Sequence, residues 1–377
     1  NFQASVNKDL ADVLGNLVGG ENPANHVDGN CNNNTAHPTS LYAGPGFTHV
    51  NNIENQSPGF ANPGAGDFTL ASNSPCLGKG PASIQPPVPA NPTPVFARTW
   101  GTTGGGSGLF DSPESIDTNA DGSRVYVADT SNHRIQEFDP RGNFVRGWGS
   151  FGTGAGLFTR PADLAVADNG DVYVAALNNN RVQQFSASGV FIRQWGSAGV
   201  GNSQFNQPHG VEVSGNDVFV ADLGNDRVQR FDRSGNFVQS IGGTGSGAGQ
   251  LDGPGGVATD STGRIYVADL FNHRIQYFNF TGGDEGAWGT QGAGTGQFGL
   301  PVDVAVGPDD TVYVVDYSNH RVQEFARPTG AGAPAQMASW GTQGSAAGQF
   351  LNPESIAVAG HQHYVADGGN DRIQVFT

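Results

Sequence analysis

Short runs of alternating residues recur along most of this chain. From Val125 the run Val-Tyr-Val-Ala alternates apolar and small residues, a polar segment Asp-Thr-Ser-Asn-His follows, and a second alternating run, Arg-Ile-Gln-Glu-Phe, ends at Phe138. Alternation with a period of two on both sides of a polar turn predicts a pair of antiparallel strands. The phrase returns five more times, at intervals of 47, 46, 47, 47 and 51 residues, which predicts a repeat protein.

Two further strands are expected in each period. The second run is followed by a third strand, and all five tryptophans of the chain stand in a Trp-Gly pair at the end of such a strand. A Gly-rich loop then leads to a Phe or Leu and, three residues later, to a proline that precedes a short apolar strand. Four strands in each of six repeats predict an all-β fold, a six-bladed β-propeller.

The two ends of the repeat array complement each other. The last repeat stops at Phe376-Thr377 after its third strand, while an unpaired strand sequence, Val95 to Gly101, precedes the first repeat. Pairing these segments completes the sixth blade and closes the ring. A closed ring removes the open sheet edges that would otherwise template aggregation.

The polar residues of the repeat predict structural ion pairs. In five repeats an aspartate stands five residues before the repeat arginine, across a tight turn, where carboxylate and guanidinium can pair and cap backbone groups. The second repeat has Ala176 at that position. The predicted structural residues are Asp129, Arg134, Arg181, Asp222, Arg227, Asp269, Arg274, Asp316, Arg321, Asp367 and Arg372.

The repeat resembles a known family. Asn-His-Arg-Ile-Gln at 132–136 and 272–276, with Asn-His-Arg-Val-Gln at 319–323, is similar to the core of the NHL repeat, and the resemblance covers about residues 95–377. It implies a propeller fold. It leaves the function open, because propellers of this family serve as enzymes, RNA binders and adhesive modules.

The negative charge of the chain bears on whether nucleic acid can be its partner. Residues 95–377 contain 28 acidic residues and 16 arginines but no lysine, and the whole chain has a formal net charge of −16. Since six of those arginines are the repeat arginines, no free basic face is expected, and a nucleic-acid partner is disfavoured. No apolar run is long enough to cross a membrane. Because the chain begins at Asn1 without a signal sequence, it is expected to be a processed chain or the C-terminal part of a longer one.

Residues 1–94 form a different segment, rich in Asn, Gly and Pro. The stretch from Asn52 to Gly78, with Gly-Asp67-Phe-x-Leu70 followed by Ser74-Pro75, resembles the closing segment of secreted right-handed parallel β-helix proteins. This resemblance implies a β-helix-like, loop-rich remnant over residues 1–80 and an extracellular or cell-surface location. Residues 81–94 are then a Pro-rich linker, and 95–377 the propeller.

Both cysteines lie in this N-terminal segment. Cys31 and Cys76 can form one stapling disulfide in an oxidising compartment, and the alternative is a pair of buried free thiols. Glycosylation sequons occur at Asn33, Asn55 and Asn279.

Chemistry, if present, is expected at the mouth of the central channel. The residues just after the inter-blade prolines give an acidic set with one histidine: Glu114, Asp163, His209, Asp303 and Glu354. This set could hold a hard cation such as calcium, or it could be a hydrated funnel that binds nothing. The family's peptide-amidating lyases use metal-binding histidines in this area, and only His209 stands in a comparable Pro-His-Gly setting here.

A second calcium candidate is local. Asp117, Asn119 and Asp121 have the spacing of oxygen ligands in the first half of a calcium loop, followed by Gly122. Position twelve is Ala128 rather than a bidentate glutamate, so the same residues also fit a wide hairpin turn. No cofactor is expected other than possible calcium.

Two functions of different classes remain. The first is a non-catalytic extracellular scaffold or binding module whose loops contact protein or glycan or support self-assembly. The second is a metal-assisted hydrolase or lyase at the acidic channel mouth, with His209 as general base. The absence of a visible nucleophile with an adjacent base favours the first.

Overall fold

The structure is a computed structural model that describes residues 27–28, 49–50, 60–62, 67–70, 93–330 and 332–377. The chain divides into two compact units, Asn1–Val88 and Pro89–Thr377. In the first unit β1 (Val27–Asp28) pairs parallel with β2 (His49–Val50), and β3 (Phe60–Asn62) pairs antiparallel with β4 (Asp67–Leu70). The remainder of the β-helix-like segment, both cysteines and the sequons at Asn33 and Asn55 lie outside the described residues, so those expectations stay predictions.

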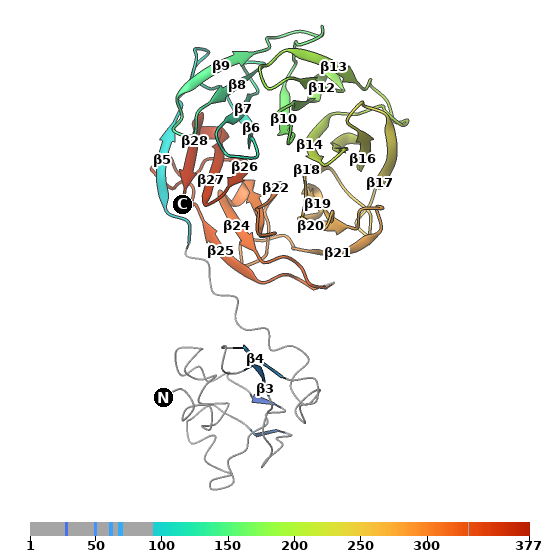
Figure 1. Ribbon diagram of the computed structural model, residues 1–377, viewed down its shortest axis with the longest axis vertical. Coiled ribbons are helices and arrows are strands. Elements are labelled where there is room, and N and C mark those ends of the chain that lie inside the picture. The colour runs from blue at the N-terminus through green and yellow to red at the C-terminus, as the bar shows by residue number, and fades with distance from the viewer. Residues whose placement is uncertain (1–26, 29–48, 51–59, 63–66, 71–92, 331) are drawn as a thin grey trace. The chain divides into compact units, whose positions relative to one another are not determined.

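The second unit is a ring of six four-stranded antiparallel sheets, as Figure 1 shows. Each blade runs from an inner strand at the axis to an outer strand at the rim, in chain order except in blade 6, whose outer strand comes from the start of the propeller. Blades 1 to 3 contain β6 (Pro113–Thr118), β7 (Val125–Asp129), β8 (Arg134–Phe138), β9 (Phe144–Trp148); β10 (Pro161–Val166), β11 (Val172–Ala176), β12 (Arg181–Phe185), β13 (Phe191–Trp195); and β14 (Pro208–Ser214), β15 (Asp217–Asp222), β16 (Arg227–Asp232), β17 (Phe237–Gly242).

Blades 4 to 6 repeat this arrangement. They contain β18 (Pro254–Thr259), β19 (Ile265–Asp269), β20 (Arg274–Phe278), β21 (Asp284–Trp288); β22 (Pro301–Val306), β23 (Val312–Asp316), β24 (Arg321–Phe325), β25 (Gln336–Trp340); and β26 (Pro353–Ala359), β27 (Gln362–Asp367), β28 (Arg372–Phe376) with β5 (Phe96–Trp100). The all-β, six-bladed propeller expected from the repeat pattern is therefore confirmed.

The ring closes through the two ends of the propeller. Strand β5 pairs antiparallel with β28, with Trp100 opposite Ile373 and Phe96 opposite Phe376. Val95 and Thr377 exchange two backbone hydrogen bonds of 2.9 and 3.0 Å. Figure 1 shows the two strands, far apart in sequence, side by side in one sheet. This is the closure predicted from the sequence.

Aromatic side chains join each blade to the next. The tryptophan at the end of an outer strand packs against the phenylalanine that ends the third strand of the following blade, for example Trp148 against Phe185 at a centroid distance of 6.0 Å. Trp100 contacts Phe138 in the same way at 5.9 Å, across the closure. The glycine after each tryptophan leaves room for the loop phenylalanine that packs on the same ring: Phe158 lies 5.6 Å from Phe185, and a Cβ on Gly149, at φ +91°, would lie 2.5 Å from the Phe158 ring.

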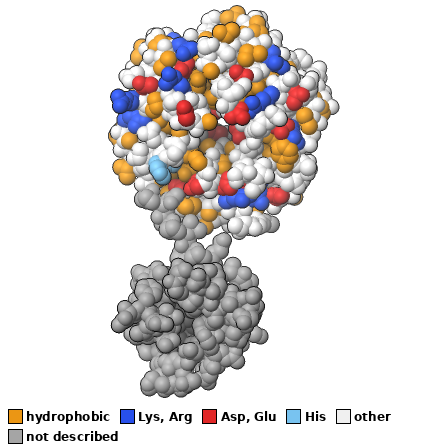
Figure 2. Space-filling model, viewed as in Figure 1, with side chains coloured by type: hydrophobic (Ala, Val, Ile, Leu, Met, Phe, Trp, Pro, Cys, Tyr) orange, Lys and Arg blue, Asp and Glu red, His pale blue; other side chains and the backbone are white. Residues whose placement is uncertain are grey.

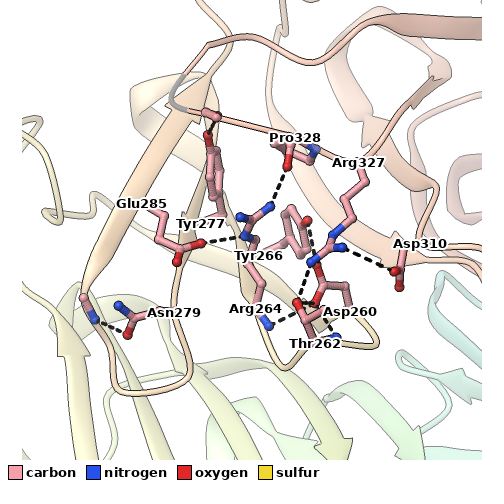
Figure 3. Close-up of polar contacts among 12 residues, drawn as sticks. Asp260, Thr262, Arg264, Tyr266, Tyr277, Asn279, Glu285, Asp310, Arg327 and Pro328 are labelled. Atoms are coloured by element: carbon pink, nitrogen blue, oxygen red, sulfur yellow. Dashed lines mark hydrogen bonds and ion pairs between the residues drawn. The ribbon is translucent and has the colours of Figure 1, made fainter. Parts of the chain in front are cut away.

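One hairpin departs from the repeat and explains the longest period. The connection between β24 and β25, described at residues 326–330 and 332–335, reaches across to blade 4 (Figure 3). The Arg327 Nε atom lies 2.8 Å from an oxygen of the buried Asp260. Arg264 donates to the Pro328 carbonyl oxygen at 2.7 Å, and the Tyr277 hydroxyl donates to the Gly330 carbonyl oxygen at 2.5 Å. The extra residues of this repeat therefore fasten blade 5 to blade 4.

Asp260 holds that contact together. Although burial favours the neutral acid, hydrogen bonds from Thr262 and from the backbone N–H of Arg264, with the charge of Arg327, hold the pKa of Asp260 below its usual value. The carboxylate is ionised where Arg327 meets it, and a charge-assisted bond of this kind is stronger than a neutral one.

Removing β5 tests the closure. A chain truncated to begin at Gly101 exposes the β28 edge of blade 6, so we expect aggregation or a large drop in melting temperature. A chain that begins at Pro94 keeps β5 and is the matched control. The measurement is thermal unfolding by circular dichroism together with light scattering. A monomeric, unchanged melt for the shorter chain would contradict the closure.

Candidate functional site in the central channel

The six inner strands surround the propeller axis and enclose a cavity of about 120 Å³. Its polar lining comes from Asp117, Asp163, Glu212, Thr259, Asp303 and Ser355. Acidic side chains also lie around the hollow at the centre of the face that Figure 2 shows. The propeller therefore has a central channel with an acidic lining, at the place where the sequence predicts one.

One ring of side chains joins neighbouring inner strands. It comprises the residues two positions after the inter-blade prolines. Asp163 of blade 2 accepts a hydrogen bond from the Val211 N–H of blade 3 at 2.7 Å. Asp303 of blade 5 accepts one from Ile356 of blade 6 at 3.0 Å. Ser115 receives the Leu164 N–H at 3.1 Å in the same way, so this ring fastens blade to blade.

Glycine occupies this ring in blades 3 and 4 because the strands come too close for a side chain. A Cβ on Gly210 would lie 2.3 Å from the carbonyl oxygen of Gly255. A Cβ on Gly256 would lie 2.2 Å from an oxygen of Asp303. The two glycines of this ring are thus explained by the close approach of neighbouring inner strands.

Two acids lie two residues further along their strands. Asp117 accepts N–H bonds from Thr118 at 2.7 Å and from Val166 of the next blade at 2.8 Å. Glu212 accepts the Thr259 hydroxyl at 2.9 Å. Burial raises the pKa of Glu212 to about 8, helped by the charge of Asp117, and burial raises the pKa of Asp117 to about 7.

Glu212 was not among the residues singled out from the sequence. The signal was present, since an acid within Val-Glu-Val at the centre of an inner strand must face the channel if the valines face the sheets on either side. For Asp117 the sequence predicts a place in a calcium loop instead.

A separate group lies where the inner strands begin, at the predicted mouth of the channel. Arg160 lies 2.5 Å from Glu114, and Glu354 is close enough to Glu114 for the two charges to repel. Burial and that repulsion raise the pKa of Glu354 to about 8. Burial, with the charge of Arg160, lowers the pKa of His209 to about 4, so its imidazole is neutral at pH 7.

Two of the five predicted channel residues, Asp163 and Asp303, line the cavity. Asp163 and Asp303 use their oxygens for inter-blade hydrogen bonds, whereas Glu114, His209 and Glu354 are the second residues of their inner strands. Burial raises the pKa of Asp163 to about 6 and, with the charge of Asp163, that of Asp303 to about 7. Among residues 93–330 and 332–377, no group of three His, Cys, Asp or Glu side chains is arranged to hold a metal ion.

The predicted calcium loop has the geometry of a hairpin. Asn119 accepts the Arg124 N–H at 2.8 Å and Asp121 accepts the Ser123 N–H at 2.9 Å, both within the turn between β6 and β7. Asp117 belongs to the channel instead, through its bond from Val166. The three side chains are thus engaged in different contacts.

The repeat aspartates pair with the repeat arginines. The five distances between the arginine Nε and the carboxylate are 2.7 Å in blades 1, 4 and 6 and 2.9 Å in blades 3 and 5. Each arginine also donates to carbonyl oxygens of the Gly-rich loop, as Arg134 does to Gly106 at 2.7 Å. The second aspartate oxygen caps the loop's last turn, as Asp129 does for the Asp111 N–H at 2.8 Å. These contacts join the Gly-rich loop that precedes a blade to the turn between the second and third strands of that blade.

Removing one of these aspartates tests their predicted structural role. Asp222→Ala leaves the Arg227 side chain, which is 12% exposed, without its partner and removes the acceptor of the Asn206 N–H, so we expect a loss of about 1–3 kcal/mol in the free energy of unfolding. Asp168→Ala is the control, because that carboxylate is 73% exposed and its ion pair with Arg233 should contribute below about 1 kcal/mol. Urea unfolding measures both, and equal effects would overturn the assignment.

The channel acids predict a pH dependence of stability. Because the folded-state pKa values of Asp117 and Glu212 are raised, the folded state keeps protons that the unfolded state releases above its ordinary values of 3.8 and 4.5. The stability that these two protonated groups contribute to the folded state is fully present below the unfolded-state pKa values. It is lost as the pH rises through the folded-state pKa values, about 7 for Asp117 and about 8 for Glu212. Glu212→Gln should flatten the fall in melting temperature between these limits. A slope identical to that of the parent protein would contradict this.

Comparisons with known proteins agree with the architecture. The model of the NHL repeat matches residues 110–138, 158–185, 205–231, 251–278 and 298–325. No curated protein sequence matches at a significant level. The sixth blade lies outside these matches, yet its Asp367–Arg372 pair has the same geometry as the others.

Several solved structures are similar in fold. A protein of unknown function from Bacteroides thetaiotaomicron is 16% identical with a TM-score of 0.56, covering 76% of each chain. A streptogramin B lyase is 15% identical with a TM-score of 0.53, covering 71% of this chain and 94% of that one. A catalytically inactive virginiamycin B lyase from Staphylococcus aureus, solved with quinupristin, is 16% identical with a TM-score of 0.50, covering 71% and 81%. At these identities the likeness concerns the fold, and the chain is a six-bladed β-propeller that contains NHL repeats.

Proposed function

We propose that this chain is a non-catalytic scaffold or binding module that acts outside the cell or at its surface, and whose propeller contacts protein or glycan or supports self-assembly. The observation that carries this proposal is how the channel acids are used. Asp163, Asp303 and Asp117 each accept a backbone N–H from the next blade. Carboxylates engaged in this way hold the ring together and are poorly placed to ligate a metal or transfer a proton.

The Gly-rich loops and short turns offer a contact surface. Phe151 is 70% exposed and Val200 is 77% exposed, both on inter-blade loops, and Phe271 on the turn between β19 and β20 is 54% exposed. The ring of His133 lies 5.1 Å from that of Phe151. Exposed aromatic rings can stack on a sugar or insert into a protein surface. No helix in the described part of the chain is long and apolar enough to cross a membrane.

The alternative is a metal-assisted hydrolase or lyase at the channel mouth. What favours it is the group of Glu114, Glu354 and the neutral His209, because a carboxyl with a pKa of about 8 carries a proton at neutral pH. The similar lyases add no weight beyond the fold.

Metal dependence separates the two functions. We expect millimolar calcium or zinc to leave the melting temperature unchanged, because a ligand stabilises only a state that binds it. The matched variant is Glu114→Gln with His209→Asn and Glu354→Gln, which alters the mouth and spares the inter-blade acids. A metal-induced rise that disappears in this variant would establish the mouth as a metal site and reverse the proposal.

The binding role has its own variant. Phe151→Ser with Phe271→Ser changes the exposed loops and leaves the core intact, so the melting temperature should stay the same. We expect self-association in sedimentation, or binding on a glycan array, to be lost in this variant and kept in the channel-mouth variant. Retained binding in the loop variant would place the contact surface elsewhere.

A further inference from the structure

Blade 2 contains a buried arginine without the carboxylate that its counterparts have. Arg181 is 7% exposed, and its two terminal nitrogens donate to carbonyl oxygens of Thr153, Gly154 and Leu157 at 2.6, 2.6 and 2.9 Å. Its Nε atom is buried and has no hydrogen-bond acceptor among the described residues. The reason is local, because Ala176 stands where five other blades have an aspartate.

The other blades show which atom is missing. In blade 1 one oxygen of Asp129 accepts from Arg134 Nε at 2.7 Å and from Gln136 Nε2 at 3.0 Å. In blade 3 Asp222 accepts from Arg227 and Gln229 at 2.9 and 3.1 Å. In blade 2 the Gln183 side chain keeps its bond to the Leu157 carbonyl oxygen at 2.8 Å but has no carboxylate to meet. Two N–H groups thus converge on a position that holds an oxygen elsewhere in the ring.

Only half of the missing carboxylate has been replaced. Asn179 accepts the Thr159 N–H at 2.7 Å, which is the role of the other aspartate oxygen in the remaining blades. Its amide nitrogen donates to the Gly152 carbonyl oxygen at 3.2 Å. The oxygen that faces the arginine has no substitute from the described part of the chain.

The charge of Arg181 is also uncompensated. A guanidinium remains ionised inside proteins, and burying one without a counter-ion is costly. No carboxylate lies within ion-pair distance of Arg181 among the described residues, whereas the other five repeat arginines each have one. Burial lowers the pKa of Arg181, with no neighbouring charge to oppose that effect.

We propose that blade 2 binds a small monovalent anion, chloride in size, at the place of the absent aspartate oxygen, between Arg181 Nε and Gln183 Nε2. Both groups that face this place are donors. An anion accepts from both and neutralises the guanidinium, whereas a water molecule would supply no charge. The site is separate from the channel; Arg181 does bind carbonyl oxygens of the loop that carries Phe151, but the anion is inferred independently of the proposed function.

Restoring the aspartate tests the anion site. Ala176→Asp supplies the carboxylate that five blades already accommodate, so it should fold and be independent of chloride. Thermal unfolding is followed while chloride replaces gluconate at constant ionic strength. We expect the parent protein to melt a few degrees below the variant in gluconate and to close that gap as chloride rises. Parallel responses of the two proteins would overturn the proposal.

A reciprocal variant and a direct observation complete the test. Asp222→Ala creates the same vacancy in blade 3, beside Asn225, and should gain a larger chloride response than the parent protein. In crystals soaked in bromide, we expect an anomalous peak within hydrogen-bond distance of Arg181 Nε and none beside the other five repeat arginines. A water molecule at that place with no bromide signal would reject the site, even if Asp222→Ala fails to fold.

Discussion

The pairing of β5 with β28 is the constraint on which the rest of the propeller depends. It joins residues from the two ends of a 283-residue array and supplies the fourth strand of the sixth blade. Five of the six outer strands end in a tryptophan that packs on the following blade, and the closure supplies one of these contacts, between Trp100 and Phe138. A ring of this kind is stabilised by the sum of similar interfaces between neighbouring blades. The sequence of one blade can therefore vary as long as its contacts with the two neighbouring blades are kept.

Within that ring, polar side chains serve mainly to join blades. The repeat aspartates and arginines connect a turn to the Gly-rich loop before it, and the channel acids connect one inner strand to the next. The hairpin at residues 326–335 adds a third kind of junction through Arg327 and Asp260. The carboxylates that look most like catalytic groups in the sequence are thus used for assembly, because backbone N–H groups at the strand junctions need acceptors.

Departures from the repeat are the informative positions. Ala176 leaves Arg181 without its carboxylate, and blade 3 has Ile241 where other outer strands end in tryptophan. Ala176 leaves the guanidinium of Arg181 without a counter-ion among the described residues. Ile241 only replaces one apolar contact by another, since it is buried in the same cluster as Phe278. In a symmetric fold such a difference can be recognised by comparison, because the five equivalent Asp–Arg pairs show which group blade 2 lacks.

The sequence alone determined the fold, the number of blades and the closure, because strand alternation and turn chemistry are local and the period of about 47 residues repeats them six times. It also identified the partners within the Asp–Arg pairs, which are five residues apart. Only the tertiary structure decided how the channel acids are used. Glu212 meets Thr259, and Asp163 meets Val211, across blade boundaries some 47 residues apart. Those contacts depend on how closely neighbouring inner strands approach the axis, a distance that no local pattern encodes.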